Sequence, residues 1–137
     1  MRLFVDTSSL FKKYVDEQGS ESFERLIAKA SEIAVSPVTW IEMNAAIERC
    51  QRGKNITPQK AKWLCAEVKK DFTYFSLVVW NENLENKAVE FIRQHGLKTM
   101  DAVQLASGVL SDAELFVTSD RPLHLAAKKA IRNVRFI

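Results

Sequence analysis

The feature that most constrains the fold is the regular alternation of short apolar runs with longer segments of helical periodicity. Five apolar runs occur, at residues 2–5, 32–35, 75–80, 115–118 and 134–137. Between them, apolar residues recur at the three- and four-residue spacing of amphipathic helices. Short apolar strands joined by helices form parallel sheets that are covered on both faces. The sequence therefore predicts one α/β domain over residues 1–137, with a parallel sheet of four to five strands between two helical layers.

Local signals predict where several helices begin and end. The Ser36-Pro37 dipeptide resembles an N-cap followed by proline at the first helical position, so a helix is expected from there to about residue 52. Thr57 and Thr99 are each expected to cap the helix that follows. Gly96 is expected to close the helix before it, because glycine is favoured just after a helix end.

Composition places the chain among ordinary globular proteins. It has 137 residues, of which 47% are hydrophobic and 27% charged. Cys50 and Cys65 form no C-x-x-C pair and lie in apolar helical patterns, so we expect reduced core residues, with a disulfide as the alternative. The first apolar run reaches Asp6 after three residues, too short for a signal peptide, and no run approaches the ~20 residues of a membrane span. We expect a soluble, cytoplasmic protein that does not associate with a membrane.

Four acidic residues lie where this fold would bring distant parts of the chain together. Asp6 and Asp120 directly follow apolar runs, and Glu42 comes shortly after another. Ligands of open α/β sheets bind at the carboxyl ends of the strands, so these three acids are expected at one edge. Asp101 instead follows a turn between two helices. Its place at the same edge is expected from its chemistry alone.

Each acid also has a simpler explanation. Asp6 and Asp120 could cap helices, Asp101 could interact with a helix dipole, and Glu42 could be an exposed helix residue. As a group they indicate something else, because clustered carboxylates repel one another unless a cation neutralises them. Hard oxygen donors select Mg²⁺ or Mn²⁺, and such sites hydrolyse or transfer phosphate esters.

Basic residues are concentrated in two segments although the net charge is only +3. Residues 49–70 contain seven basic residues and one acid, and residues 121–137 contain five basic residues and no acid. Basic surface around an acidic site suits a polyanionic substrate, although solvated helix faces would explain either segment alone. Four candidates for phosphate contacts are Arg49, Arg52, Lys98 and Arg121.

Four segments of the chain carry a family resemblance. They are Leu3–Ser8, Ser36–Glu42, Leu97–Ala106 and Phe116–Asp120, in this order. With them the chain resembles the PIN domain, and most closely the VapC-type ribonuclease toxins of toxin–antitoxin pairs. The resemblance spans the whole chain, and none of the four acids departs from it.

The resemblance implies an Mg²⁺- or Mn²⁺-dependent endoribonuclease with an acidic quartet of Asp6, Glu42, Asp101 and Asp120. Asp6, Asp101 and Asp120 are expected to hold the metal directly or through water, and Glu42 to position or deprotonate the attacking water. Thr118, or alternatively Ser119, corresponds to a hydroxyl that orients a ligand or water beside the last acid. The resemblance also implies an RNA substrate, a VapB-like antitoxin that blocks the active site, and a homodimer. Members of the family cut structured RNAs, but which RNA they cut varies among them and is not carried over to this chain.

Other functions remain as alternatives. An aspartyl phosphotransferase could use Asp6, but the haloacid dehalogenase pattern has a second Asp where this chain has Ser8. Hydrolysis by Ser8 or Ser9 with His124 lacks the G-x-S-x-G turn. The non-enzymatic alternative is a PIN-like module that binds RNA or protein without cutting. The presence of all four acids favours the enzyme.

Overall fold

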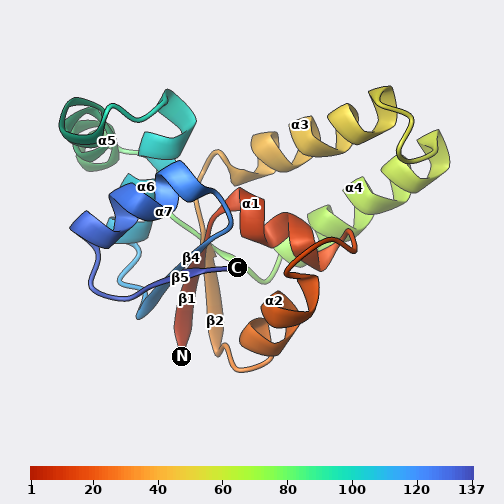
Figure 1. The fold of residues 1–137 in the computed structure, drawn as a ribbon, viewed down its shortest axis with the longest axis horizontal. Helices are drawn as coiled ribbons and strands as arrows, with labels where there is room; N and C mark the ends of the chain where they lie inside the picture. Colours follow the sequence, from red (N-terminus) through yellow and green to blue (C-terminus); the bar gives the residue numbers. More distant parts are fainter.

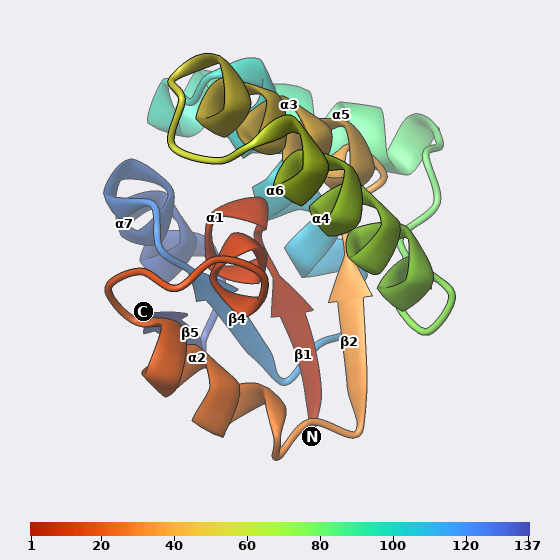
Figure 2. The same cartoon turned by 90° about the vertical axis from the view of Figure 1, so that its right-hand side faces the viewer.

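The computed structural model describes residues 1–137 and consists of a five-stranded parallel sheet between two layers of helices (Figures 1 and 2). The strands are β1 (Arg2–Val5), β2 (Glu32–Val35), β3 (Ser76–Leu77), β4 (Leu115–Thr118) and β5 (Val134–Phe136). They follow the order β3-β2-β1-β4-β5, and every neighbouring pair is parallel. The predicted fold class is therefore confirmed.

The order of the strands creates a switch point at the middle of the sheet. From β1 the chain moves outward through β2 to β3, and it then returns to the other side of β1 as β4. In open α/β sheets a crevice for ligands forms where the strand order reverses in this way. Here the crevice lies above the carboxyl ends of β1 and β4, which pair from Leu3–Leu115 to Val5–Val117.

Seven α-helices cover the two faces. One layer contains α1 (Thr7–Leu10), α2 (Ser20–Ile27), α3 (Thr39–Arg52) and α4 (Pro58–Phe72), together with the 3-10 turn η1 (Phe11–Lys13). The other layer contains α5 (Glu82–His95), α6 (Thr99–Leu110) and α7 (Arg121–Ala130). The α3–α4 pair runs antiparallel and projects beyond the sheet (Figure 1). No helix is long and apolar enough to cross a membrane.

The alternation of side chains along β1 divides the interior into two cores. Leu3 and Val5 join the core beneath α1 to α4, whereas Phe4 joins the core beneath α5 to α7. Successive side chains of a strand point to opposite faces, so one short apolar run supplies both cores. Phe4 and Phe116 stack at a centroid distance of 5.2 Å in the second core.

Two of the predicted caps are confirmed and two are wrong. Thr57 accepts a hydrogen bond from the Lys60 amide (3.1 Å), and Gly96 ends α5 with a φ of 63°. Helix α3, however, begins at Thr39 rather than at Ser36-Pro37. The buried Ser36 hydroxyl is hydrogen-bonded to Ser107 Oγ (3.1 Å) and accepts a hydrogen bond from the Val38 amide (3.3 Å), which keeps it in a turn before the helix. Thr99 is the first helical residue of α6, and Lys98 takes the cap position.

Two further expectations are corrected. The strand predicted for residues 75–80 is only Ser76–Leu77, because β3 is an edge strand with β2 as its single partner. Both cysteines are free. Cys65 packs against a core as expected, but Cys50 is half-buried and lines a surface pocket instead.

Candidate active site

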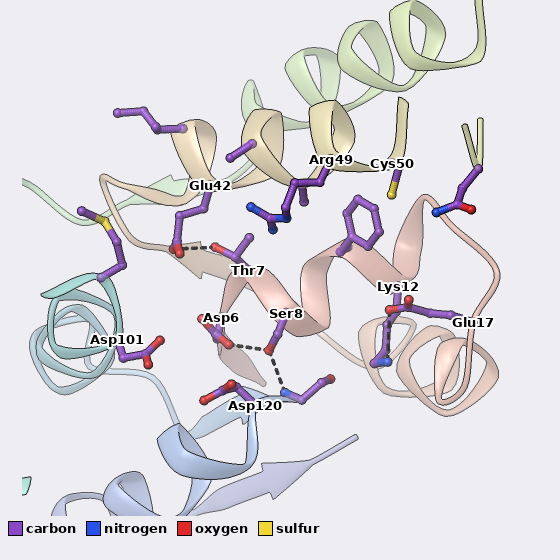
Figure 3. A pocket seen from close by; sticks show the side chains of 17 residues that line it. Asp6, Thr7, Ser8, Lys12, Glu17, Glu42, Arg49, Cys50, Asp101 and Asp120 are labelled. Carbon is purple, nitrogen blue, oxygen red and sulfur yellow. Dashed lines mark hydrogen bonds and ion pairs between the residues drawn. The ribbon is translucent and has the colours of Figure 1, made fainter. Parts of the chain in front are cut away.

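A pocket of about 780 Å³ lies at the switch point of the sheet and brings the four predicted acids together (Figure 3). Asp6 follows β1, Asp120 follows β4, and Glu42 and Asp101 project from α3 and α6. The expectation that Asp101 shares the edge with the other three is met, although it follows no strand.

All four acids lie at the start of a helix. Asp6 and Asp120 occupy the N-cap positions of α1 and α7, and Glu42 and Asp101 lie in the first turns of α3 and α6. The amino ends of helices carry a partial positive charge, which offsets part of the repulsion among the carboxylates. The convergence of these helices is thus one reason why the fold can hold four acids in one pocket.

Asp6 is the most buried of the four, with 4% of its surface exposed. Its Oδ2 accepts hydrogen bonds from Ser8 Oγ (2.5 Å) and Thr118 Oγ1 (2.9 Å), whereas Oδ1 has no protein partner. Burial, reinforced by the charges of Glu42 and Asp101, raises the pKa of Asp6 to about 7 despite these two hydrogen bonds. Its side chain does not cap α1, so the capping explanation is wrong for Asp6.

Asp101 and Asp120 interact with each other through their charges. Burial raises the pKa of Asp101, the charges of Asp120 and Glu42 raise it further, and Lys98 acts in the opposite direction. Asp120 Oδ2 accepts a hydrogen bond from the Leu123 amide (2.9 Å), so this residue both caps α7 and lines the pocket. The structural and functional interpretations of Asp120 are therefore compatible.

Hydroxyl groups connect the acids. Thr118 Oγ1 donates to Asp6 and accepts from the Asp120 amide (3.1 Å), so the predicted hydroxyl lies between these two acids. Ser119 lines the pocket, but its hydroxyl is bonded to Ser9 (2.7 Å) rather than to an acid. Sequence reasoning did not single out Thr7, which donates to Glu42 Oε1 (3.0 Å). Its position directly after Asp6 was the available signal.

The donor set fits a hard cation that keeps part of its water. No group of three or more His, Cys, Asp or Glu side chains is arranged to hold a metal ion directly. Mg²⁺ is commonly bound through only one or two carboxylates plus several waters. The free Oδ1 of Asp6 lies near Glu42 and Asp101, and burial, reinforced by neighbouring carboxylates, raises the pKa values of Asp6 and Asp101, so this position is suited to such an ion.

Basic side chains line the other end of the pocket. Of the four predicted phosphate contacts, only Arg49 lines it (Figure 3). Arg52 pairs with Glu48 (2.8 Å) along α3, and Arg121 lies over the Phe136 ring at 5.1 Å. Lys12, which was not predicted, also lines the pocket and pairs with Glu17 (3.2 Å).

Comparison with known proteins identifies similar folds. The family model of the PIN domain matches residues 3–129. VapC20 from Mycobacterium tuberculosis, described as a Sarcin-Ricin loop cleaving toxin, is 19% identical with a TM-score of 0.69, over 90% of this chain and 94% of that one. VapBC2 from Rickettsia felis, bound to a promoter DNA fragment, is 13% identical with a TM-score of 0.67, over 100% of this chain and 99% of that one. A toxin–antitoxin complex from Klebsiella pneumoniae is 19% identical with a TM-score of 0.65, over 88% and 87%. No curated protein sequence matched the chain.

Proposed function

Because the chain belongs to the PIN domain family, we propose that it is a VapC-type toxin: a metal-dependent endoribonuclease that is neutralised by a cognate antitoxin. The observation that carries the proposal is the meeting of four carboxylates, from four separate elements, in one pocket at the switch point of the sheet. Similarity of fold to proteins described as toxins and toxin–antitoxin complexes supports the biological role.

In the proposed mechanism, Asp6, Asp101 and Asp120 hold Mg²⁺ or Mn²⁺ directly or through water. When bound, the cation supplies neutralisation of the charge that develops on the phosphate oxygens. Asp6 offers its free Oδ1, while Ser8 and Thr118 keep its Oδ2 in place. Arg49, at the other end of the pocket, contacts the RNA backbone.

Glu42 positions the attacking water and accepts its proton. Glu42 Oε2 has no protein partner, so it is available for this task. The water oxygen forms a bond to phosphorus as the P–O3′ bond breaks. The departing O3′ oxyanion takes up a proton from solvent, and Glu42 returns its proton to solvent, so the products are a 5′-phosphate and a 3′-hydroxyl.

Metal-dependent RNA cleavage is the decisive test. Purified protein is incubated with total RNA in Mg²⁺, Mn²⁺ or EDTA, and the fragment ends are mapped by 5′-phosphate-dependent ligation. We expect discrete fragments in either metal, none in EDTA, and none with Asp6→Asn. Asp112→Asn is the matched control, because Asp112 is exposed, lies outside the pocket, and has a φ of 56° that asparagine tolerates.

Two outcomes would contradict the proposed activity. If Asp6→Asn cut RNA as fast as the wild-type protein, the acidic quartet would have no role in the mechanism. Retention of RNA without cleavage in any metal would favour the non-cutting PIN-like module. Trapping of a fluoroberyllate adduct on Asp6 would instead support the phosphotransferase.

The proposed partners require separate tests. A cognate antitoxin predicts a short neighbouring gene whose product, when co-expressed, forms a stable complex and suppresses RNA cleavage. A homodimer predicts a mass twice that of one chain in light scattering. Persistent activity in the presence of that product would refute the antitoxin role, and a monomeric mass at micromolar concentration would refute the dimer.

A further inference from the structure

Gln104 is a buried polar residue in an otherwise apolar stretch. It lies on α6 one turn after Asp101 and has no exposed surface. Its immediate neighbours along the helix are Val103 and Leu105, both of which are buried and belong to the core beneath α5 to α7. A residue that served packing alone at this position would be apolar, because a buried amide must find hydrogen-bond partners.

The Gln104 amide nitrogen points toward Glu42. Nε2 lies 2.6 Å from Glu42 Oε1, 2.9 Å from Thr7 Oγ1 and 3.3 Å from Thr39 Oγ1. Thr7 in turn donates its hydroxyl hydrogen to the same Glu42 oxygen. Glu42 Oε1 therefore accepts hydrogen bonds from two neutral groups, on α1 and α6, whereas Oε2 stays free.

The remaining atom of the amide shows which contact determines its orientation. Gln104 Oε1 is buried and has no hydrogen-bond partner. Rotating the amide would place its oxygen, instead of its nitrogen, 2.6 Å from Glu42 Oε1, and two acceptors cannot share that contact. The structure thus leaves a buried carbonyl oxygen unsatisfied and keeps an N–H donor on the carboxylate.

We propose that Gln104 is a positioning residue that fixes the carboxylate of Glu42 for its role in RNA cleavage. This inference rests on the function proposed above. With one oxygen held by Gln104 and Thr7, the other is aimed at the reacting water without a rotational search. The amide does so without forming the ion pair that a lysine or arginine would impose on the base.

Kinetics of Gln104→Met test this role, since methionine matches the length of glutamine but donates no hydrogen bond. On an RNA that the wild-type protein cuts, at saturating Mg²⁺, we expect kcat to fall by about 10- to 100-fold. KM should stay within about threefold, because Gln104 is buried away from bound RNA. Ser107→Ala is the matched control: Ser107 is also buried on α6 and hydrogen-bonded to Ser36 and to the Val103 carbonyl, but not to an acid. Its kcat should not change.

A second measurement does not depend on cleavage. In a nitrogen-15 NMR spectrum, one glutamine side-chain amide should lie downfield, disappear in Gln104→Met, and move in Glu42→Ala. Glu90→Ala is the control and should leave this signal in place, because Glu90 is hydrogen-bonded to the exposed Gln94 (3.3 Å) and is remote from the pocket.

The outcomes separate this inference from the proposed function. If wild-type protein cuts no RNA, the proposed function fails, and the NMR spectra alone decide whether Gln104 holds Glu42. If wild-type cuts and folded Gln104→Met keeps its kcat within about threefold, the positioning role is wrong. Equal losses of kcat in Gln104→Met and Ser107→Ala would also overturn it. So would a Gln104 amide signal that does not move in Glu42→Ala.

Discussion

At the scale of single residues, the surroundings of Asp6 disfavour the ionised form of its carboxyl group. The buried Asp6 carboxyl lies near Glu42 and Asp101, and its pKa rises from an ordinary 3.8 to about 7. Asp101 in turn lies near Asp120, so all four acids interact through their charges. The cost of this arrangement depends on pH, which makes it measurable.

The first prediction is that the metal-free protein loses stability as pH rises. The folded state keeps the Asp6 proton between about pH 4 and pH 7, whereas the unfolded state releases it, so the free energy of unfolding falls through this range. At about 1.4 kcal/mol per pKa unit, the loss is at most about 4 kcal/mol. Urea unfolding in EDTA at pH 5 and pH 8 should show the fall in wild-type protein and a smaller one in Asp6→Asn. An identical pH dependence in both proteins would contradict it.

The second prediction concerns the hydroxyl between Asp6 and Asp120. Thr118→Val keeps the shape of the side chain but removes its bonds to Asp6 and to the Asp120 amide. RNA cleavage should fall by about 10- to 100-fold, and stability by about 1–2 kcal/mol. Ser119→Ala is the control, because the Ser119 hydroxyl contacts Ser9 and no acid. A greater loss of cleavage in Ser119→Ala than in Thr118→Val would mean that Ser119, rather than Thr118, supplies the functional hydroxyl.

At the scale of secondary-structure elements, the interiors of helices follow sequence periodicity, but their ends depend on individual contacts. Thr57 and Thr99 have the same side chain near the start of a helix, yet only Thr57 caps one. The third prediction is that Thr57→Ala lowers stability by about 1 kcal/mol, whereas the exposed Thr99→Ala changes it by less than about 0.5 kcal/mol. Urea unfolding of both variants checks this, and equal losses would mean that Thr99 also caps.

The fourth prediction concerns two glycines. At Gly108 a side chain has no space, whereas at Gly96 the backbone has a positive φ. A Cβ on Gly108 would lie 2.4 Å from the Phe116 ring, so Gly108→Ala should push α6 off β4 and cost about 1–3 kcal/mol. Gly96 has open space around it but a φ of 63°. Gly96→Asn should therefore be tolerated, because asparagine adopts this conformation. A Gly108→Ala protein with wild-type unfolding behaviour would show that the packing of α6 on β4 adjusts freely.

At the scale of the whole molecule, the strand order places the four acids in one pocket, and Arg49 of α3 lines the same pocket. The fifth prediction concerns Arg49, studied in the Asp6→Asn background so that RNA is not cut. Replacing Arg49 with alanine should reduce the slope of log affinity against log salt concentration by about 0.7, the value for one phosphate contact on a single strand. Arg52→Ala is the matched control on the same helix, since Arg52 pairs with Glu48 outside the pocket. An equal change in both slopes would point to nonspecific charge rather than to a pocket contact.

The sequence by itself determined the layered architecture and the identity of the acids. Periods of two and of three to four residues depend only on backbone geometry, and they specify which side chains must be buried. For this reason the parallel α/β class was predictable, and the cap at Thr57 and the helix end at Gly96 were predictable from the residue types favoured at helix ends. Asp6, Glu42 and Asp120 could be placed at one edge because each follows a predicted strand.

Only the tertiary structure decided how these residues meet. Thr118 and Asp6 are 112 residues apart, and Gln104 and Glu42 are 62 apart, so no local pattern reveals their hydrogen bonds. The same limit explains the errors at Ser36 and β3: a distant hydroxyl from Ser107 holds Ser36 in a turn, and β3 has a partner on one side only. Local periodicity reports what is buried, but the partners of a buried polar group are set by the packing of elements that lie far apart in the chain.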